Sequence, residues 1–197
     1  NSDTEILLKY YIKYGEKCLE YFEGMWSFAI YNKANGELFL ARDRFGEKPL
    51  FYQYKNNNFF FSSELKSFKI EQFSNEINQN TFGSFLKFGY IPEPNTIYKN
   101  IFKLEKGSLI ELNILKDELK FTKKKYFNLI SFLKQQKKLD KDNSSLEQKL
   151  TLAIERVHLS DAPLGIFLSS GIDSSLLLAI SSQKLGKKID SFTLGYD

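Results

Sequence analysis

The sequence of 197 residues has a single cysteine, Cys18. One cysteine excludes an internal disulfide framework and a zinc site built from cysteines. Such sparse cysteine use is typical of cytosolic proteins, in which disulfides are rare, so we expect a cytoplasmic location. Cys18 falls within a short helical pattern, and we expect it to be a small core residue.

Long apolar runs and a leader pattern are also missing. No stretch approaches the roughly 18 consecutive apolar residues that would cross a bilayer, and no basic segment followed by an apolar one opens the chain. We therefore expect no membrane partner. The first residue is Asn rather than Met, and we expect the sequence to be a fragment truncated at both ends.

Arginine is scarce: Arg42, Arg44 and Arg156 stand among 28 basic residues, and the net charge is +4. Surfaces that bind nucleic acids draw on arginine for bidentate phosphate contacts, so we expect no nucleic-acid partner. The lysine runs at 123–125 and 137–138 are interpreted as solvated surface.

Apolar residues are plentiful, and their spacing changes along the chain. A hydrophobic fraction of 42% with 16% aromatics is enough for a packed core. Helical spacing predicts a helix that Gly15 ends, a second short helix around Cys18, and a helix over 79–90. Between them, Asn35-Gly36 and the asparagines at 56–58 predict the turns of two hairpins, which we expect to form an antiparallel meander.

The composition and the spacing of apolar residues change after residue 114. Residues 115–145 are charged, weakly periodic and end in turn formers, and they are interpreted as a linker. Beyond them an amphipathic helix, a short apolar strand at 164–168, a helix and a second strand alternate, which predicts the first βαβ unit of a parallel sheet. The predicted domains are therefore 1–114 and 146–197.

The string "LSSGIDSS" at 168–175 follows the first of these apolar strands. A small-residue loop between a buried strand and a helix presents free backbone N–H groups and the positive end of the helix dipole to anions. Gly171 allows close approach of a phosphate, the serines add hydroxyl donors, and Asp173 requires a divalent cation beside that phosphate. The pattern therefore predicts a magnesium-bound nucleotide polyphosphate, although the same serines and aspartate could simply cap the helix.

The loop resembles the Ser-Gly-Gly-x-Asp-Ser loop of the ATP-pyrophosphatase families, with Ser170 in place of the second glycine. Several families share this loop, and other segments of the sequence distinguish among them. These segments are "NSDTE" at 1–5, "GMWSFAIYN" at 24–32, "ARDRFGEKPLFY" at 41–52, "SSELKSF" at 62–68, "FGYIPEPNTIYKNIFKLEKGS" at 88–108 and "LSDAPLGIFLSSGIDSS" at 159–175. In this order they resemble a glutamine-hydrolysing asparagine synthetase. The resemblance covers nearly the whole chain and is weakest in the linker.

This resemblance implies an α+β glutaminase domain of the Ntn-hydrolase type, with antiparallel sheets and helices, followed by the start of an α/β parallel-sheet ATP-pyrophosphatase domain. It implies a ligase that uses Mg²⁺ and ATP to adenylate aspartate and amidates it with ammonia from glutamine. The small-molecule partners would be glutamine, aspartate and ATP, and a homodimer is compatible with the family.

The resemblance also assigns residues. Asp3 matches the aspartate that binds the α-amino group of glutamine, although it could be only a helix cap. Asp173 matches a magnesium ligand. Seven positions match residues that bind ATP in this family: Leu168, Ser169, Ser170, Gly171, Asp173, Ser174 and Leu194. Without the resemblance, Leu168 and Leu194 would be interpreted as core residues.

Three further expectations concern residues outside these sites. The family's nucleophile is an N-terminal cysteine, whereas position 1 here is Asn and Cys18 has no free amine, so no residue of this chain is expected to be catalytic and the chain alone is expected to be inactive. Arg42, Asp43 and Arg44 are expected to form structural ion pairs. His158 is expected at the surface or in packing contacts.

Three alternatives stay open at this point. A related amidotransferase could amidate a sugar or another carboxylate acceptor. The chain could be a non-catalytic module that binds a nucleotide or regulates a partner. A different enzyme with a pyrophosphatase loop, such as one that thiolates tRNA, would not be expected to carry both "SDTE" and "ARDRFGEKPLFY".

Overall fold

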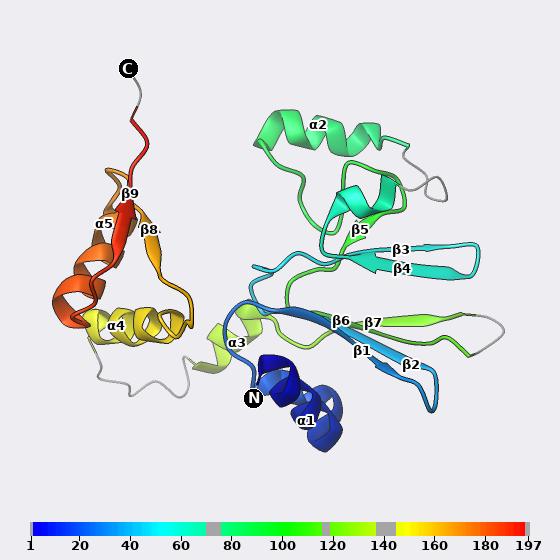
Figure 1. Ribbon diagram of the computed structural model, residues 1–197. Coiled ribbons are helices and arrows are strands. Elements are labelled where there is room, and N and C mark those ends of the chain that lie inside the picture. The colour runs from blue at the N-terminus through cyan, green and yellow to red at the C-terminus, as the bar shows by residue number, and fades with distance from the viewer. Residues whose placement is uncertain (1, 70–75, 116–118, 137–144, 196–197) are drawn as a thin grey trace. The chain divides into compact units, whose positions relative to one another are not determined.

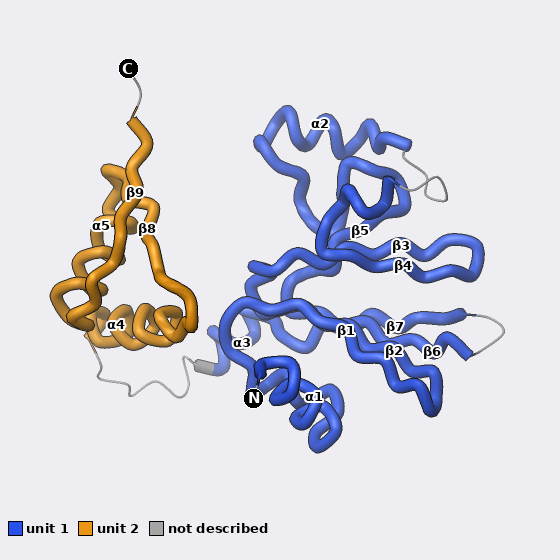
Figure 2. Tube along the Cα trace, viewed as in Figure 1, with its two compact units in different colours: residues 1–138 blue, residues 139–197 orange. Residues whose placement is uncertain are grey.

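The computed structural model describes residues 2–69, 76–115, 119–136 and 145–195. The chain divides into two compact units, Asn1–Lys138 and Leu139–Asp197 (Figure 2). The described part of the chain contains no helix that is both long enough and apolar enough to cross a membrane.

The first unit opens with the expected pair of helices. Helix α1 spans Asp3–Tyr14 and ends at Gly15, whose φ of 58° lies in the left-handed region that favours glycine. The 3₁₀ helix η1, Gly15–Glu20, follows and buries Cys18 and Leu19. Both expected helices are therefore confirmed, as is the core position of Cys18.

Two antiparallel sheets form the centre of this unit. The four-stranded sheet has the order β1-β2-β6-β7 and the three-stranded sheet has the order β4-β3-β5. The strands are β1 Ser27–Asn32, β2 Glu37–Arg42, β3 Phe51–Lys55, β4 Asn58–Ser62, β5 Phe102–Lys103, β6 Ser108–Asn113 and β7 Phe121–Lys125. The remaining helices are η2 Leu65–Lys69, α2 Gln79–Phe88 and α3 Leu129–Gln136.

The two sheets pack face to face between helices (Figure 1). Leu40 of β2 and Ile110 of β6 meet Tyr52 of β3 in one buried cluster. On the other face of the four-stranded sheet, Phe39 lies against Tyr11 of α1, with 4.9 Å between ring centroids. Because side chains alternate along a strand, neighbouring residues of β2 fill two different apolar layers.

The two predicted hairpins form, but the single meander is wrong. Strand β2 pairs with β6, Leu40 opposite Ile110, whereas β3 belongs to the other sheet. The cause lies in residues 43–50, where the Asp43 carboxylate accepts hydrogen bonds from the N–H groups of Phe45, Glu47 and Lys48, each at 3.0 Å. This turn leads the chain away from β2 into the second sheet.

The predicted linker is too long at its N-terminal side, because residues 121–136 contain β7 and α3. The lysine-rich β7 is an edge strand that pairs with β6. Two of its lysines have acidic partners: Lys123 lies 2.7 Å from Glu105, and Lys124 lies 2.7 Å from Glu111. Charged edge strands resist association with other sheets, so polar composition here marks an edge rather than a linker.

The second unit has the predicted alternation of helices and strands. Its elements are α4 Leu146–Val157, β8 Gly165–Phe167, α5 Ile172–Ala179, the π-helical turn η3 Ile180–Lys184 and β9 Asp190–Phe192. Ser145 caps α4 in a capping box with Gln148. Strands β8 and β9 are parallel, with Ile166 opposite Ser191, so the βαβ prediction is confirmed.

Candidate functional site

Asp3 is the first residue of α1, and its neighbour Ser2 occupies the cap position. The Ser2 Oγ accepts the hydrogen bond from the Glu5 N–H at 3.3 Å, so the cap role does not need Asp3. Asp3 lines a cavity of about 310 Å³ together with apolar side chains that include Ile6, Met25 and Trp26. An exposed carboxylate beside an apolar wall can hold an ammonium group whose carbon chain lies against that wall.

Sequence reasoning did not single out the apolar wall of this cavity. Met25 and Trp26 precede β1, and Trp26 is oriented by its neighbours: its carbonyl accepts the Asp43 N–H at 2.9 Å, and its ring stacks on Tyr126 at 6.2 Å between centroids. The string "GMW" just before a predicted strand was the available signal. This string could not reveal that the start of α1, which carries Asp3, lies at the same cavity as Met25 and Trp26.

The Arg42–Asp43–Arg44 segment is structural, as expected, although only Arg42 has an ion pair among the described residues. The buried Arg42 guanidinium lies 2.9 Å from Glu93 and also donates to the Leu104 carbonyl at 2.6 Å. The Asp43 carboxylate accepts hydrogen bonds from backbone N–H groups instead of pairing with a cation. The Arg44 guanidinium donates a hydrogen bond to the Glu20 carbonyl at 3.0 Å. The segment therefore fixes the turn between the two sheets.

In the second unit, the loop at 168–175 folds into a compact serine cluster. The Ser174 Oγ lies 2.9 Å from the Ser169 Oγ and accepts the Ser169 N–H at 3.1 Å. The Ser169 Oγ in turn accepts the Gly171 N–H at 3.2 Å. These bonds bring Ser169, Gly171 and Ser174 together as the sequence predicts, while Ser170 stays exposed at the bend.

Helix α5 begins at this cluster without a cap from any described side chain. Its N-cap is Gly171, and Asp173 is exposed in the first turn. The reading of the serines and Asp173 as mere caps is therefore not supported by the hydrogen bonds. Backbone N–H groups at an uncapped helix start can bind phosphate oxygens.

The other two predicted residues of this site lie beside the loop. The Leu168 N–H donates to the Phe192 carbonyl at 2.8 Å, and the Thr193 Oγ1 donates to the Leu168 carbonyl at 2.9 Å. Leu194, the next residue, is 82% exposed. Thr193, which the sequence did not single out, therefore links the end of β9 to the end of β8. The high exposure of Leu194 shows that it is not a core residue of this unit.

A magnesium ion would have Asp173 as its protein ligand here. Among the described residues, no group of three or more histidine, cysteine or acidic side chains is placed to hold a metal. One carboxylate fits Mg²⁺ nevertheless, because this ion commonly keeps several waters and is held by one or two carboxylates plus the phosphates of a nucleotide.

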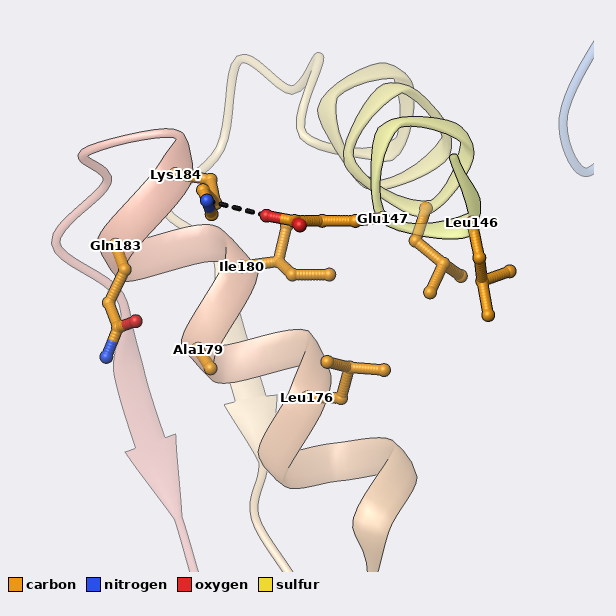
Figure 3. Close-up of a pocket in the computed structure, with 8 residues that line it drawn as sticks. Leu146, Glu147, Leu176, Ala179, Ile180, Gln183 and Lys184 are labelled. Carbon is orange, nitrogen blue, oxygen red and sulfur yellow. Dashed lines mark ion pairs between the residues drawn. The ribbon is translucent and has the colours of Figure 1, made fainter. Parts of the chain in front are cut away.

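A cavity of about 470 Å³ in the same unit is a different feature (Figure 3). It lies between α4 and the α5–η3 helix, and its walls are mainly apolar, with Leu146, Leu176 and Ile180 among them. Glu147 and Lys184 form an ion pair of 2.6 Å there. None of the loop serines lines this cavity, so it is not the predicted phosphate site.

His158 follows α4 and packs against η3, as expected. Its Nε2 lies 3.2 Å from the Oγ of the buried Ser181, and that hydroxyl donates to the Leu177 carbonyl at 2.6 Å. The hydroxyl proton is therefore used, which assigns the N–H of the ring to Nε2. The histidine ties α4 to η3 and has a packing role.

Comparison with known proteins agrees with both halves of the molecule. Residues 1–127 match the family model described as a glutamine amidotransferase domain. The chain belongs to the glutamine amidotransferase family. In this amidotransferase chain, residues 145–197 also match the family model described as asparagine synthase. The expected fold class is thereby confirmed: an amidotransferase domain with antiparallel sheets and helices precedes the start of a synthetase domain.

Several similar proteins are named as glutamine-hydrolysing asparagine synthetases. Over its whole length the chain is 34% and 30% identical to the glutamine-hydrolysing asparagine synthetases 1 and 3 of Bacillus subtilis, covering 30% and 32% of those proteins. It is 36% identical to a Methanocaldococcus jannaschii protein provisionally named as such a synthetase, and it covers 38% of that protein. The chain thus spans about a third of the length of these relatives, and the resemblance stated from its motifs is confirmed.

Proposed function

We propose that this amidotransferase chain is part of an enzyme that makes asparagine from aspartate, using glutamine as nitrogen donor and ATP as energy source. The observation that carries the proposal is the 168–175 loop, a serine cluster at the uncapped start of α5 in a chain whose first unit is an amidotransferase domain. The names of the relatives point to the same reaction.

The proposed chemistry has two steps in the synthetase domain. An oxygen of the aspartate β-carboxylate attacks the α-phosphorus of ATP, and pyrophosphate leaves. Ammonia then attacks the resulting acyl carbon, and AMP leaves with the oxygen that bonded to phosphorus. Adenylation is needed because a free carboxylate has no good leaving group.

The residues of this chain would bind and orient the reactants. Ser169, Ser170, Gly171 and Ser174, with the first-turn N–H groups of α5, would hold the β- and γ-phosphates. Asp173 would hold Mg²⁺, which reduces the charge on those phosphates when it is bound. Leu168 and Leu194 would border the nucleotide. In the first unit, Asp3 would bind the α-ammonium group of glutamine. The domain division near residue 145 and a cytoplasmic location belong to the same proposal.

The test is aspartate-dependent release of AMP by the intact protein. With glutamine or ammonium as nitrogen source, we expect one AMP and one asparagine for each ATP consumed. Asp173→Asn should lower kcat/KM for ATP by about 100-fold or more with either nitrogen source, because a charged group at the phosphates is lost. Ser160→Ala, outside the loop, is the matched control.

Other outcomes of this assay decide between the alternatives. AMP release that depends on a different carboxylate acceptor would make the protein a related amidotransferase. Binding of ATP without AMP release under any acceptor would leave the non-catalytic module as the better description.

A further inference from the structure

The peptide group between Leu168 and Ser169 opens the serine loop, and a hydroxyl group holds it at each end. Its carbonyl, which belongs to Leu168, accepts a hydrogen bond from the Thr193 Oγ1 at 2.9 Å. Its N–H, which belongs to Ser169, donates to the Ser174 Oγ at 3.1 Å. The two hydroxyls come from different elements, since Thr193 follows β9 and Ser174 lies in the first turn of α5. One peptide plane is therefore fixed from two sides.

The Thr193 side chain takes the place of a backbone donor where the two-stranded sheet ends. The pairing of β8 with β9 stops at Phe167 opposite Phe192, and the Leu168 N–H adds one more bond to the Phe192 carbonyl at 2.8 Å. In a longer parallel ladder, the Leu168 carbonyl would next accept the N–H of Leu194. Here the donor is the Thr193 hydroxyl, so the Leu168 carbonyl has a partner although the ladder does not continue.

The orientation of this peptide group decides what the loop presents to an anion. A peptide group that rotates about its two Cα atoms exchanges the directions of its N–H and its carbonyl. A carbonyl oxygen that faced the bound anion would repel it, whereas backbone N–H groups attract it. The bond to Thr193 directs the Leu168 carbonyl away from that position. An anion then meets the N–H groups at the start of α5, which no described side chain caps.

The contribution of this hydrogen bond to stability is small. Thr193 is exposed, so the bond is an ordinary one that water can replace. The strands are also joined without it, by backbone pairs such as Ile166 opposite Ser191. What the hydroxyl adds is the direction of one carbonyl at the entrance of the loop.

We propose that Thr193 is a positioning residue of the ATP site. Its hydroxyl fixes the peptide group that precedes the serine loop, and thereby the loop that would hold the β- and γ-phosphates. Thr193 acts through Leu168 and Ser169 rather than by contact with the nucleotide. The inference rests on the proposed function, because it concerns the same site.

The first measurement is the dissociation constant of Mg-ATP for the intact protein without aspartate, by calorimetry. Thr193→Val keeps the branching of the side chain and removes its hydroxyl, and we expect the dissociation constant to rise about 3-fold to 10-fold. Thr193→Ser keeps a hydroxyl, so its constant should stay within about twofold of the original. Thr151→Val is the matched control, because the Thr151 Oγ1 donates to the Glu147 carbonyl at 2.8 Å within α4, and ATP binding should not change.

The second measurement needs no nucleotide. Amide hydrogen exchange of a peptide that covers residues 168–175, followed by mass spectrometry, reports the opening of the loop. In Thr193→Val we expect this exchange to be at least about threefold faster, while peptides from α4 keep their rates. In steady-state assays the KM for ATP should rise and the KM for aspartate should not. A loss of folded protein would instead lower kcat and leave both KM values unchanged.

Three results would overturn the inference. The first is that Thr193→Val binds Mg-ATP as tightly as the original protein, since Thr193 would then only join the strands. The second is that Thr193→Ser loses as much affinity as Thr193→Val, because the hydroxyl would not be responsible. The third is that exchange becomes faster throughout the second unit, which would mean a general loss of stability.

The inference and the proposed function fail separately. If the original protein binds no Mg-ATP and releases no AMP, the proposed function is wrong. The exchange experiment then decides the role of Thr193 by itself: an unchanged rate in Thr193→Val overturns it, and a faster rate confined to residues 168–175 supports it.

Discussion

The carboxylate of Asp3 stands at the start of α1, beside the Met25 and Trp26 side chains. Asp3→Asn removes its charge without changing its size. We expect the KM for glutamine to rise by about 10-fold to 100-fold, because a charge-assisted hydrogen bond to an ammonium group is lost. Activity with ammonium as nitrogen source should be unchanged, since it does not use this cavity.

The measurement is asparagine formation by the intact protein with each nitrogen source. Glu23→Gln, at another carboxylate of the same cavity, is the matched control. An equal loss with glutamine and with ammonium would mean that Asp3 supports the fold rather than the substrate.

Cys18 is fully buried in η1, and burial raises the pKa of its thiol to about 11. Because the thiolate is the reactive form, iodoacetamide should not label the native protein at pH 8, while labelling should be complete in guanidinium chloride. The raised pKa also means that the neutral thiol stabilises the fold below its unfolded pKa of about 8.5 and that this contribution is lost as the pH rises toward 11. Intact mass after timed labelling checks the first point, and rapid native labelling would contradict the buried position.

Individual residues could be predicted from the sequence only where the local string decides their surroundings. Ser169, Gly171 and Ser174 lie within six positions of one another, so a loop conformation alone brings them together. Trp26 and Asp3 share a cavity because of how η1 returns the chain. Such tertiary contacts leave no periodicity in the sequence.

At the scale of elements, two glycines with the same backbone requirement have different surroundings. Gly89 after α2 has a φ of 74° and Gly107 before β6 has a φ of 63°. A Cβ at Gly89 would meet nothing within 4 Å, whereas a Cβ at Gly107 would lie 2.7 Å from the Phe127 carbonyl oxygen. The pair separates the cost of the left-handed conformation from the cost of a steric clash.

Gly89→Ala should therefore lower the free energy of unfolding by about 1–2 kcal/mol, the cost of a left-handed alanine. Gly107→Ala should lower it by about 1–3 kcal/mol more, because the carbonyl of Phe127 must move. Urea denaturation followed by tryptophan fluorescence measures both variants, since Trp26 is in the same unit. If the two variants lose the same free energy of unfolding, the carbonyl of Phe127 can move away from the new Cβ without destabilising the fold.

Elements with strong local signals were predicted correctly, and the others were not. The capped α4 and the asparagine turn of β3–β4, where Asn56 and Asn57 have φ of 50° and 58°, follow from a few adjacent residues. Strand β7 could not be found in this way, because its lysines are stabilised by acidic residues of other segments, Glu105 and Glu111. Its strand conformation depends on pairing with β6.

At the scale of the molecule, the two units have cores of different extent. In the first unit, β2 lies between β1 and β6 and buries residues on both faces. In the second, the described apolar residues that are buried are Ile166 and Ile180. The division into an amidotransferase part and a synthetase part was predictable from the change in periodicity, whereas the layering of the first unit depended on long-range pairing.

Amide hydrogen exchange should report this difference. We expect the amides of Leu40 and Ile110 to exchange at least about 100-fold more slowly than those of β8 and β9, since protection follows the free energy of the opening that exposes each amide. Mass spectrometry of peptides from each unit, after timed labelling, gives the rates. Similar protection in both units would show that the second unit is as stable as the first.

The pairing of β2 with β6 also matters for the chain as it leaves the ribosome. Leu40 cannot pair with Ile110 until about 70 more residues have been synthesised. Their synthesis takes roughly 4 to 14 seconds at about 5–20 residues per second. During that interval the β1–β2 hairpin has an apolar strand with one open edge, the kind of surface that joins nascent chains to one another. Closely spaced ribosomes on one message therefore favour aggregation of this chain, and a pause in translation before residue 113 lengthens the period of risk.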